Sequence, residues 1–448
     1  MSLTIVATCA FSEGTQAQQA SIQAVTGATV IDGTGRGPIK DAVIVIEDDR
    51  ITRVGPASTT AIPTNARIIP ARERFIIPGL ADMHNHLNDG TLRADPQDQL
   101  GNLGQLLAWG VTLVFDPGLS MKSFDRLRQE TRKPGAPYPR FYGVGRLFGA
   151  KGGWGSFQGG YTPETPEEAR ADVRQLKAAN VDAVKLVYDD MSHLVQRPLP
   201  ALRPELMAAI IDETHRQGLK AYVHAPILRY AKEALRAGAD GLLHGVLSDP
   251  VDDEFVALMK QNHAVYVSTL TVFEACADVS AFVKREAGFE TGGRIARKTY
   301  DILADSAPIQ QAPWWTNSAY TKSHLPILRA NLKRMVDAGV LVTTGTDAGV
   351  PGVLLGVSSQ LELVLHVEAG VPPATVIRLA TLNAARMIGR ADDLGSIEAG
   401  KLADFIVLDG DPLADIRNVR RIALVVKGGE IRSPDAWSSM PRTTQDST

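Results

Sequence analysis

The sequence predicts an α/β protein, in which a (β/α)8 TIM-like barrel carries a small β-sandwich domain formed from both chain ends. Two observations predict this fold. The middle of the chain alternates short apolar runs with helical stretches, and eight such runs occur, which is the number of strands that closes a barrel. Both ends instead carry short β-rich runs punctuated by turn residues. A chain of 448 residues is long enough to hold both parts.

The two β-rich ends have the same character, although the whole middle of the chain separates them. Their strand-like runs are residues 29–31, 42–46, 51–54, 403–408 and 422–426. We expect residues 23–75 and 391–435 to supply the two halves of the β-sandwich and residues 76–390 to form the barrel. Residues 1–22 and 436–448 are then tails outside both parts.

The barrel elements follow one another in a regular order. The predicted strands are 76–83, 111–116, 140–146, 181–188, 219–224, 240–244, 265–270 and 341–346. The predicted helices include 164–179, 204–217, 229–237, 252–262, 325–338 and 373–387. The strand runs are apolar almost throughout, as is typical of parallel strands covered on both faces.

One connection breaks the regular order. Residues 271–324 separate the last two predicted strands and are far longer than an ordinary connection. They contain helical patches and the pair Trp314-Trp315. A long connection at the carboxyl ends of barrel strands is a candidate lid over a site.

Composition excludes several partners. The formal net charge is −3, and no basic stripe points to nucleic acid or to an anionic membrane. No run beyond the N-terminus approaches the roughly 20 apolar residues of a transmembrane segment. Cys9 and Cys276 lie too far apart in sequence to indicate a disulfide or a metal-binding pair. We expect a small-molecule substrate, and a homo-oligomer is an open alternative to a monomer.

The N-terminus has two interpretations. Residues 4–11 are apolar and precede a polar stretch with small residues, as at the end of a secretory signal peptide, but no basic residues come before them. A clipped signal would make the protein periplasmic or exported. A disordered tail would leave it cytoplasmic.

Histidines stand at the ends of three predicted strands. His84 and His86 close the first, and residues two apart on an extended strand point to the same face, so both project into the barrel mouth. His224 ends the fifth strand and His244 ends the sixth. A lone histidine at such a place is more often structural than a ligand, but histidines at three strand ends together predict a metal site at the face where barrel active sites lie.

Asp347 and Lys185 complete the candidate set. Asp347 follows the eighth strand; beside glycine it could simply cap a turn, but next to the histidines we expect a metal ligand and a proton shuttle. Lys185 lies inside an apolar strand, where an unpaired ammonium is costly. It either reaches a carboxylate such as Asp82 or Asp189, or is N-carboxylated so that its new carboxylate bridges two metal ions.

Several motifs together resemble the amidohydrolase superfamily, in its imidazolonepropionase-like and prolidase-like branch. The matching segments are Ile77–His86, Val184–Leu186, His224-Ala225, Gly238–Gly245, Thr344–Asp347, Ala380–Ala385, Gly395–Asp404 and Lys427–Gly429. The resemblance runs from about residue 25 to residue 432. No single segment is specific, but the combination is.

The resemblance implies one or two divalent metal ions, most often zinc. His84, His86 and Asp347 would hold the buried ion, His224 and His244 the more exposed one, and carboxylated Lys185 would bridge them. An unmodified Lys185 would favour a single metal ion, so the metal count stays open. Some dipeptidase-like relatives have a second histidine after the fifth-strand ligand, whereas this chain has His224-Ala225-Pro226. A peptide-carboxylate-binding role is therefore not carried over.

The metal chemistry predicts the reaction class. Coordination lowers the pKa of a bound water to about 7, so that a hydroxide is available to attack a carbonyl at neutral pH. We expect Asp347 to pass the proton of this nucleophile to the leaving nitrogen. The predicted function is hydrolysis of a C–N amide bond in a peptide, an N-acyl amino acid or a cyclic amide. The alternatives are a heterocycle or nucleobase deaminase, and a metal-binding relative without activity.

The substrate cannot be read from the loops. Residues 148–163 are glycine-rich but lack a phosphate-binding pattern, and we expect a flexible substrate loop there. Trp154, Phe157 and Tyr161 are candidate substrate contacts on it. Tyr188, at the end of the fourth strand, is either another contact or a buried structural residue. His193, just beyond it, either approaches the site or remains a loop residue.

Overall fold

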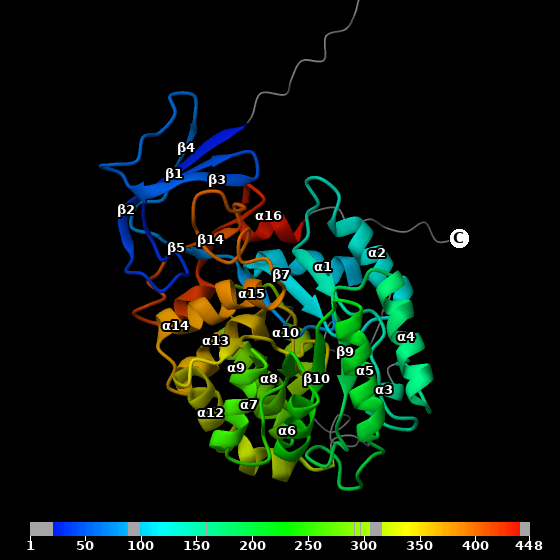
Figure 1. The fold of residues 1–448 in the computed structure, drawn as a ribbon. Helices are drawn as coiled ribbons and strands as arrows, with labels where there is room; N and C mark the ends of the chain where they lie inside the picture. The colour runs from blue at the N-terminus through cyan, green and yellow to red at the C-terminus, as the bar shows by residue number, and fades with distance from the viewer. Residues whose placement is uncertain are drawn as a thin grey trace, which may run out of the picture.

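The structure is a computed structural model, and it describes residues 21–87, 99–157, 159–290, 292–295, 297–304 and 316–439. The N-terminal tail with its predicted signal, the pair Trp314-Trp315 and most of the C-terminal tail lie outside these ranges. In Figure 1, a sheet in blue and orange lies at one end of a larger body of strands and helices.

Eight strands from the two chain ends form one sheet. They are β1 (Ile22–Val30), β2 (Ile39–Glu47), β3 (Arg50–Pro56), β4 (Arg67–Pro70), β5 (Phe75–Pro78), β14 (Phe405–Leu408), β15 (Ile422–Lys427) and β16 (Glu430–Arg432). Their order is β16-β15-β14-β5-β1-β2-β3, with β4 paired to β1. The two chain ends meet where β5 pairs antiparallel with β14, in the register Ile77 to Ile406. The pairing of the two β-rich ends thus takes the form of one hydrogen-bonded sheet.

This sheet has its own hydrophobic core. The buried faces of β1, β2 and β14 bring together side chains such as Val25, Ile44 and Phe405, all at most 1% exposed. The turn between β2 and β3 falls at Asp48-Asp49, where Asp48 takes a positive φ of 56°. Aspartate tolerates this left-handed conformation better than most residues do, which is why such pairs make turns.

Eight further strands carry the candidate site, each inside its predicted range. They are β6 (Leu80–Asp82), β7 (Val111–Asp116), β8 (Arg140–Gly143), β9 (Val184–Val187), β10 (Ala221–His224), β11 (Gly241–Leu243), β12 (Val265–Val267) and β13 (Leu341–Thr343). All their pairings are parallel, in one sheet of order β6-β7-β8 and another of order β13-β12-β11-β10-β9. The predicted first strand, 76–83, is divided at Gly79, because its first part is β5 of the other sheet.

Backbone hydrogen bonds link the two parallel sheets along both pairs of facing edges. Beyond β6 and β13, Met83 N donates to Thr344 O at 3.0 Å and Asp347 N to His84 O at 2.6 Å. Between β8 and β9, Phe148 N donates to Lys185 O at 2.8 Å. These bonds bring the carboxyl ends of all eight strands to one face of the molecule.

Helices connect the strands and cover them. They are α1 (Gln99–Ala108), α2 (Met121–Thr131), α3 (Trp154–Phe157), α4 (Pro166–Ala178), α5 (Pro204–Arg216), α6 (Leu228–Arg236), α7 (Asp253–Gln261), α8 (Leu270–Ala277), α9 (Val279–Phe289), α10 (Arg297–Ala304), α12 (Ser318–Asp337), α13 (Val357–Glu368), α14 (Pro373–Arg378), α15 (Ala384–Met387) and α16 (Pro434–Ser438), with a π turn at Leu379–Asn383 and a 3₁₀ turn at Ile416–Arg420. Side-chain caps begin several of them, as where Asp252 accepts a hydrogen bond from Phe255 N ahead of α7.

The helix expectations hold with some differences in extent. The four helices predicted between residues 164 and 262 appear as α4 to α7, with no end shifted by more than two residues. Helix α12 begins seven residues before the predicted start at 325 and contains Pro326 in its interior. Residues 373–387 form α14, the π turn and α15 in succession.

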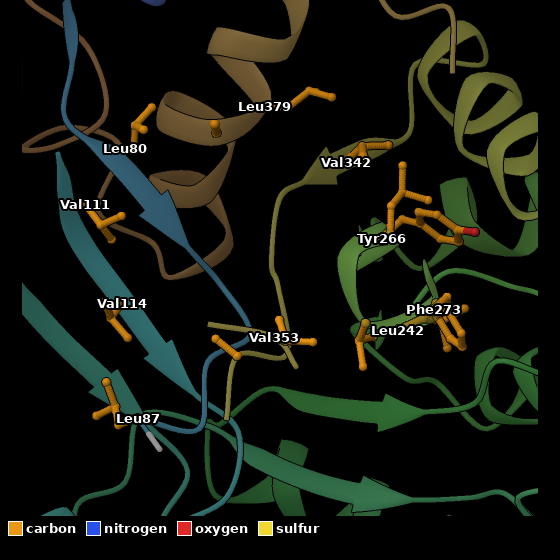
Figure 2. Close-up of a cluster of buried hydrophobic side chains, with 14 of the residues drawn as sticks. Leu80, Leu87, Val111, Val114, Leu242, Tyr266, Phe273, Val342, Val353 and Leu379 are labelled. Atoms are coloured by element: carbon orange, nitrogen blue, oxygen red, sulfur yellow. The ribbon is translucent and has the colours of Figure 1, made fainter. Parts of the chain in front are cut away.

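The long connection 271–324 is largely helical where the structure describes it. It comprises most of α8, then α9, α10 and the start of α12, and α8 packs against both α12 and α13. Phe273 of α8 belongs to the main hydrophobic cluster, which Figure 2 shows together with residues from both parallel sheets, including Leu80, Val114 and Tyr266. This part of the connection is therefore integrated into the protein core.

Among the described residues, no helix combines the length and apolar character needed to cross a membrane.

Candidate metal centre

The six candidate ligands lie in five strands or directly after them. His84 and His86 follow β6, Lys185 lies in β9, His224 ends β10, His244 follows β11 and Asp347 follows β13. All six line one cavity of about 430 Å³. Chain segments more than 250 residues apart in the sequence thus supply the walls of a single chamber.

His84, His86 and Asp347 form the tightest group. Oδ1 of Asp347 lies 3.0 Å from Nε2 of His86 and 3.3 Å from Nε2 of His84. This oxygen is buried and has no hydrogen-bond partner among the described residues. Two imidazole nitrogens converging on an unpartnered carboxylate oxygen suit a divalent metal ion, which binds such donors at about 2.0–2.2 Å.

The loop after β13 can approach His84 this closely because of a glycine. A Cβ atom at Gly345 would lie 2.7 Å from Cβ of His84, inside any real contact distance. Two residues on, Asp347 adopts a positive φ of 62°. The backbone carries this strain where the carboxylate must face the histidines, as is frequent at functional sites.

His224 and His244 lie beside this group, and each has a polar partner for one ring nitrogen. Their ring centroids are 4.5 Å apart, and His244 is also 4.5 Å from His84. Nδ1 of His244 lies 2.8 Å from Oγ1 of Thr269, and Nε2 of His224 lies 3.1 Å from Oδ2 of Asp189. Such partners fix the ring orientation and leave the second nitrogen available to a metal ion.

Burial favours the uncharged form of three of these histidines, whereas Asp347 raises the pKa of His86. Burial lowers the pKa of His224 to about 3 and that of His84 and His244 well below the ordinary range, so the neutral imidazole is favoured. Neutral imidazole is the form that binds a metal ion.

Lys185 is only 3% exposed, and burial lowers its pKa to about 7, because an ammonium is poorly solvated there. The pairing with Asp82 or Asp189 that the sequence left open does not form. The Asp82 carboxylate accepts hydrogen bonds from Thr346, Ser359 and Asn85, whereas Asp189 lies against His224 and His193.

Of the four expected substrate contacts, the structure places Trp154 in the cavity lining and the other three outside it. Trp154, in the short helix α3, lines the cavity. Tyr188 and Tyr161 do not appear among its lining residues: the Tyr188 hydroxyl donates to Glu233 of α6, and the Tyr161 ring packs on Phe148 with a centroid separation of 5.3 Å. Phe157 is 67% exposed.

The sequence offered Asp189 only as a possible partner of Lys185, assigned no role to Thr269 and left the role of His193 open. His193 lines the cavity, and its Nδ1 lies 3.3 Å from Oδ2 of Asp189. Asp189 follows Lys185 at twice the two-residue repeat of an extended strand, so strand alternation could have placed it on the same face. Thr269 gave no signal, because its contact with His244 depends on a left-handed turn, with φ of 48°, after β12.

Comparison with known proteins identifies the family. The family model described as "Amidohydrolase family" matches residues 75–432, which is most of the chain. The chain belongs to the amidohydrolase family. The imidazolonepropionase of Micrococcus luteus is 27% identical over 405 residues, covering 85% of this chain and 90% of that protein. These findings indicate a hydrolase that acts on carbon–nitrogen bonds.

Other relatives match over shorter stretches or in fold. The imidazolonepropionase of Geobacillus kaustophilus is 38% identical over 106 residues. This match covers 23% of this chain and 25% of that protein. A putative prolidase from Bifidobacterium longum has 25% sequence identity and a TM-score of 0.73, covering 93% of this chain and 98% of its own. A Xaa-Pro dipeptidase with bound methionine has 23% identity and a TM-score of 0.72, covering 92% and 100%, and shows the shared fold. This amidohydrolase therefore has the imidazolonepropionase-like and prolidase-like character that its motifs predicted.

Proposed function

We propose that this amidohydrolase cleaves a C–N amide bond of a small molecule, with Asp347 as the residue that moves the proton. One observation carries the proposal. The Asp347 carboxylate lies within 3.3 Å of Nε2 of both His84 and His86, on the wall of the cavity. A carboxylate at this position can hold a metal ion and exchange a proton with a substrate in the same chamber.

The residues fit one or two divalent metal ions, for which we propose zinc. His84, His86 and Asp347 would hold the first ion. His224 and His244 would hold the second, with Lys185 as a carboxylated bridge between the two. Bound metal would supply an activated water and polarise the substrate carbonyl. We further propose that the eight parallel strands form a closed barrel over residues 76–390, with the β domain from residues 23–75 and 391–435 at its side.

The chain's own residues then act in order. Asp347 accepts the proton of the attacking water and delivers it to the leaving nitrogen, so that an amine and not an amide anion departs. Thr269 and Asp189 hold His244 and His224 in one ring orientation throughout. Trp154 and the apolar cavity wall would hold the substrate and limit the entry of further water.

The substitution Asp347→Asn tests the proposal. It removes the proton acceptor and preserves the shape of the side chain. We expect kcat to fall by about 100- to 10,000-fold. Metal analysis and circular dichroism should show that the folded protein still binds metal. Asp253→Asn, at a fully exposed carboxylate on α7, is the matched control and should leave kcat unchanged.

Other results would contradict the proposal. Full turnover by Asp347→Asn would show that another group moves the proton. Release of ammonia from a heterocycle by zinc-loaded protein that cleaves no amide would indicate deamination instead.

A further inference from the structure

The walls of the cavity beyond the metal centre are apolar. The apolar lining residues are Pro117, Leu147, Trp154, Val187, Met191, Leu194, Val272, Phe273, Cys276, Val350 and Pro351. They come from the strand ends of both parallel sheets and from α8 of the long connection. A substrate that fills this chamber therefore meets hydrocarbon and aromatic surface away from its reacting atoms.

Among the described residues, charged groups reach the cavity only at the metal centre. Among the lining residues that the structure describes, Lys185 and Asp347 are the only ones that carry a formal charge. His193 is the remaining polar side chain outside the six candidate ligands, and Asp189 lies 3.3 Å from its Nδ1. Even as a cation, His193 would be neutralised by that carboxylate.

Two arginines on the neighbouring loops, Arg146 and Arg229, are committed elsewhere. The Arg146 guanidinium lies 4.1 Å from the centre of the Tyr161 ring, and its Nε donates to Gly159 O at 2.9 Å. Arg229, just after β10, donates to Oδ2 of Asp190 at 2.9 Å. Neither residue belongs to the cavity lining. Away from the metal centre, a carboxylate held against this wall would lose its hydration without gaining a cationic partner among the described lining residues, which is strongly unfavourable.

Because the described wall is apolar beyond the metal centre, we propose that the substrate is an uncharged amide with apolar groups flanking the scissile bond. The inference rests on the proposed function and narrows it. Amides that join an aromatic or aliphatic acid to an amine without a charged group can pack their apolar parts against this wall. N-acyl amino acids and dipeptides would place a free carboxylate against it.

Matched substrates test this inference on the zinc-loaded, full-length protein. Benzoylglycinamide and benzoylglycine share one scissile bond and differ in a single charge, and benzanilide is apolar on both sides. With benzoate release as the readout, we expect kcat/KM for benzoylglycinamide to exceed that for benzoylglycine by at least about thirtyfold. Benzanilide should be hydrolysed at least as well as benzoylglycinamide.

A variant reverses the preference. Leu194 lines the cavity and is partly exposed, so Leu194→Arg can place a guanidinium at the wall without filling the core. We expect this variant to improve benzoylglycine relative to benzoylglycinamide by about tenfold or more. Leu194→Gln, polar but uncharged, is the control and should leave the ratio near its original value.

The possible outcomes distinguish a failure of the substrate inference from a failure of the proposed function. Equal or faster hydrolysis of benzoylglycine by the unmodified enzyme would overturn the substrate inference and leave amide hydrolysis standing. An unchanged ratio in Leu194→Arg would also count against the inference. Failure to cleave any of these or a wider set of amides, with metal bound, would contradict the proposed function itself.

Discussion

Oδ2 of Asp189 accepts a hydrogen bond from Nε2 of His224 at a distance of 3.1 Å, and both side chains are buried. The contact selects the tautomer of His224 in which Nδ1 has a free lone pair. Metal-binding histidines commonly depend on such a carboxylate for their orientation. Asp189 thus acts on the proposed metal centre through His224.

The substitution Asp189→Asn should weaken metal binding. An amide cannot match the charged hydrogen bond, and we expect the zinc affinity of the His224 site to fall by about 10- to 100-fold. Titration with a competing zinc chelator measures this change. Asp190→Asn is the matched control, because the neighbouring carboxylate faces Arg229 and Tyr230 instead. Equal affinities for the two variants would remove Asp189 from the metal centre.

We expect the chemical state of Lys185 to decide the number of bound metal ions. If its carboxylated form bridges two ions, Lys185→Met removes the bridge, and metal content should fall from about two zinc ions per chain to about one. Elemental analysis measures the content, and mass spectrometry of the intact native protein detects the added carboxyl group. One zinc ion per chain in the unmodified protein, together with a bare Lys185, would rule out the binuclear centre.

Asp82 should be important for stability. Its carboxylate accepts hydrogen bonds from Thr346 N, Thr346 Oγ1, Ser359 Oγ, Asn85 Nδ2 and His84 N, at 2.7–3.3 Å. Asp82→Ala leaves the side-chain donors of this group without this buried acceptor, and we expect a loss of about 3 kcal/mol in the free energy of unfolding. Ser359→Ala removes one of the bonds and should cost about 1 kcal/mol. Urea denaturation of both variants in the same buffer compares them, and a loss of about 1 kcal/mol or less for Asp82→Ala would contradict this prediction.

Glu286 should make stability depend on pH. This side chain is fully buried in α9, and burial raises its pKa well above the ordinary value of 4.5. Folding therefore takes up a proton, and this contribution to stability, complete below pH 4.5, is lost as the pH rises toward the pKa of the folded state. In that window the loss approaches about 1.4 kcal/mol per pH unit.

Glu286→Gln should remove this dependence. The variant and the unmodified protein should unfold alike near pH 4.5, whereas the variant should be more stable by about 1 kcal/mol or more at pH 8. Denaturation at a series of pH values gives both curves. Glu205→Gln, at an exposed site on α5, is the control and should follow the unmodified protein. Parallel curves for Glu286→Gln would show that the carboxyl is ionised in the folded state.

The backbone arrangement was largely readable from the sequence, because buried parallel strands are continuous apolar runs. The strand ends also located His84, His224 and Asp347 at one face. Contacts set by tertiary packing could not be read in this way. Tyr188 ends its strand where a site residue would, yet its hydroxyl reaches Glu233 on a helix. The division of the first strand at Gly79 depends on β14, which lies far away in the sequence.

Because β5 pairs with β14, the β domain cannot complete its sheet until a late part of the chain has been synthesised. Ile77 and Ile406 are neighbours in the sheet although about 330 residues separate them, a stretch that takes about 15–65 seconds to translate. During that time β5 has an open edge, where another chain can pair. β5 can pair with β14 only after residues 76–390 have left the ribosome, so this pairing marks a chain that has been translated beyond β14.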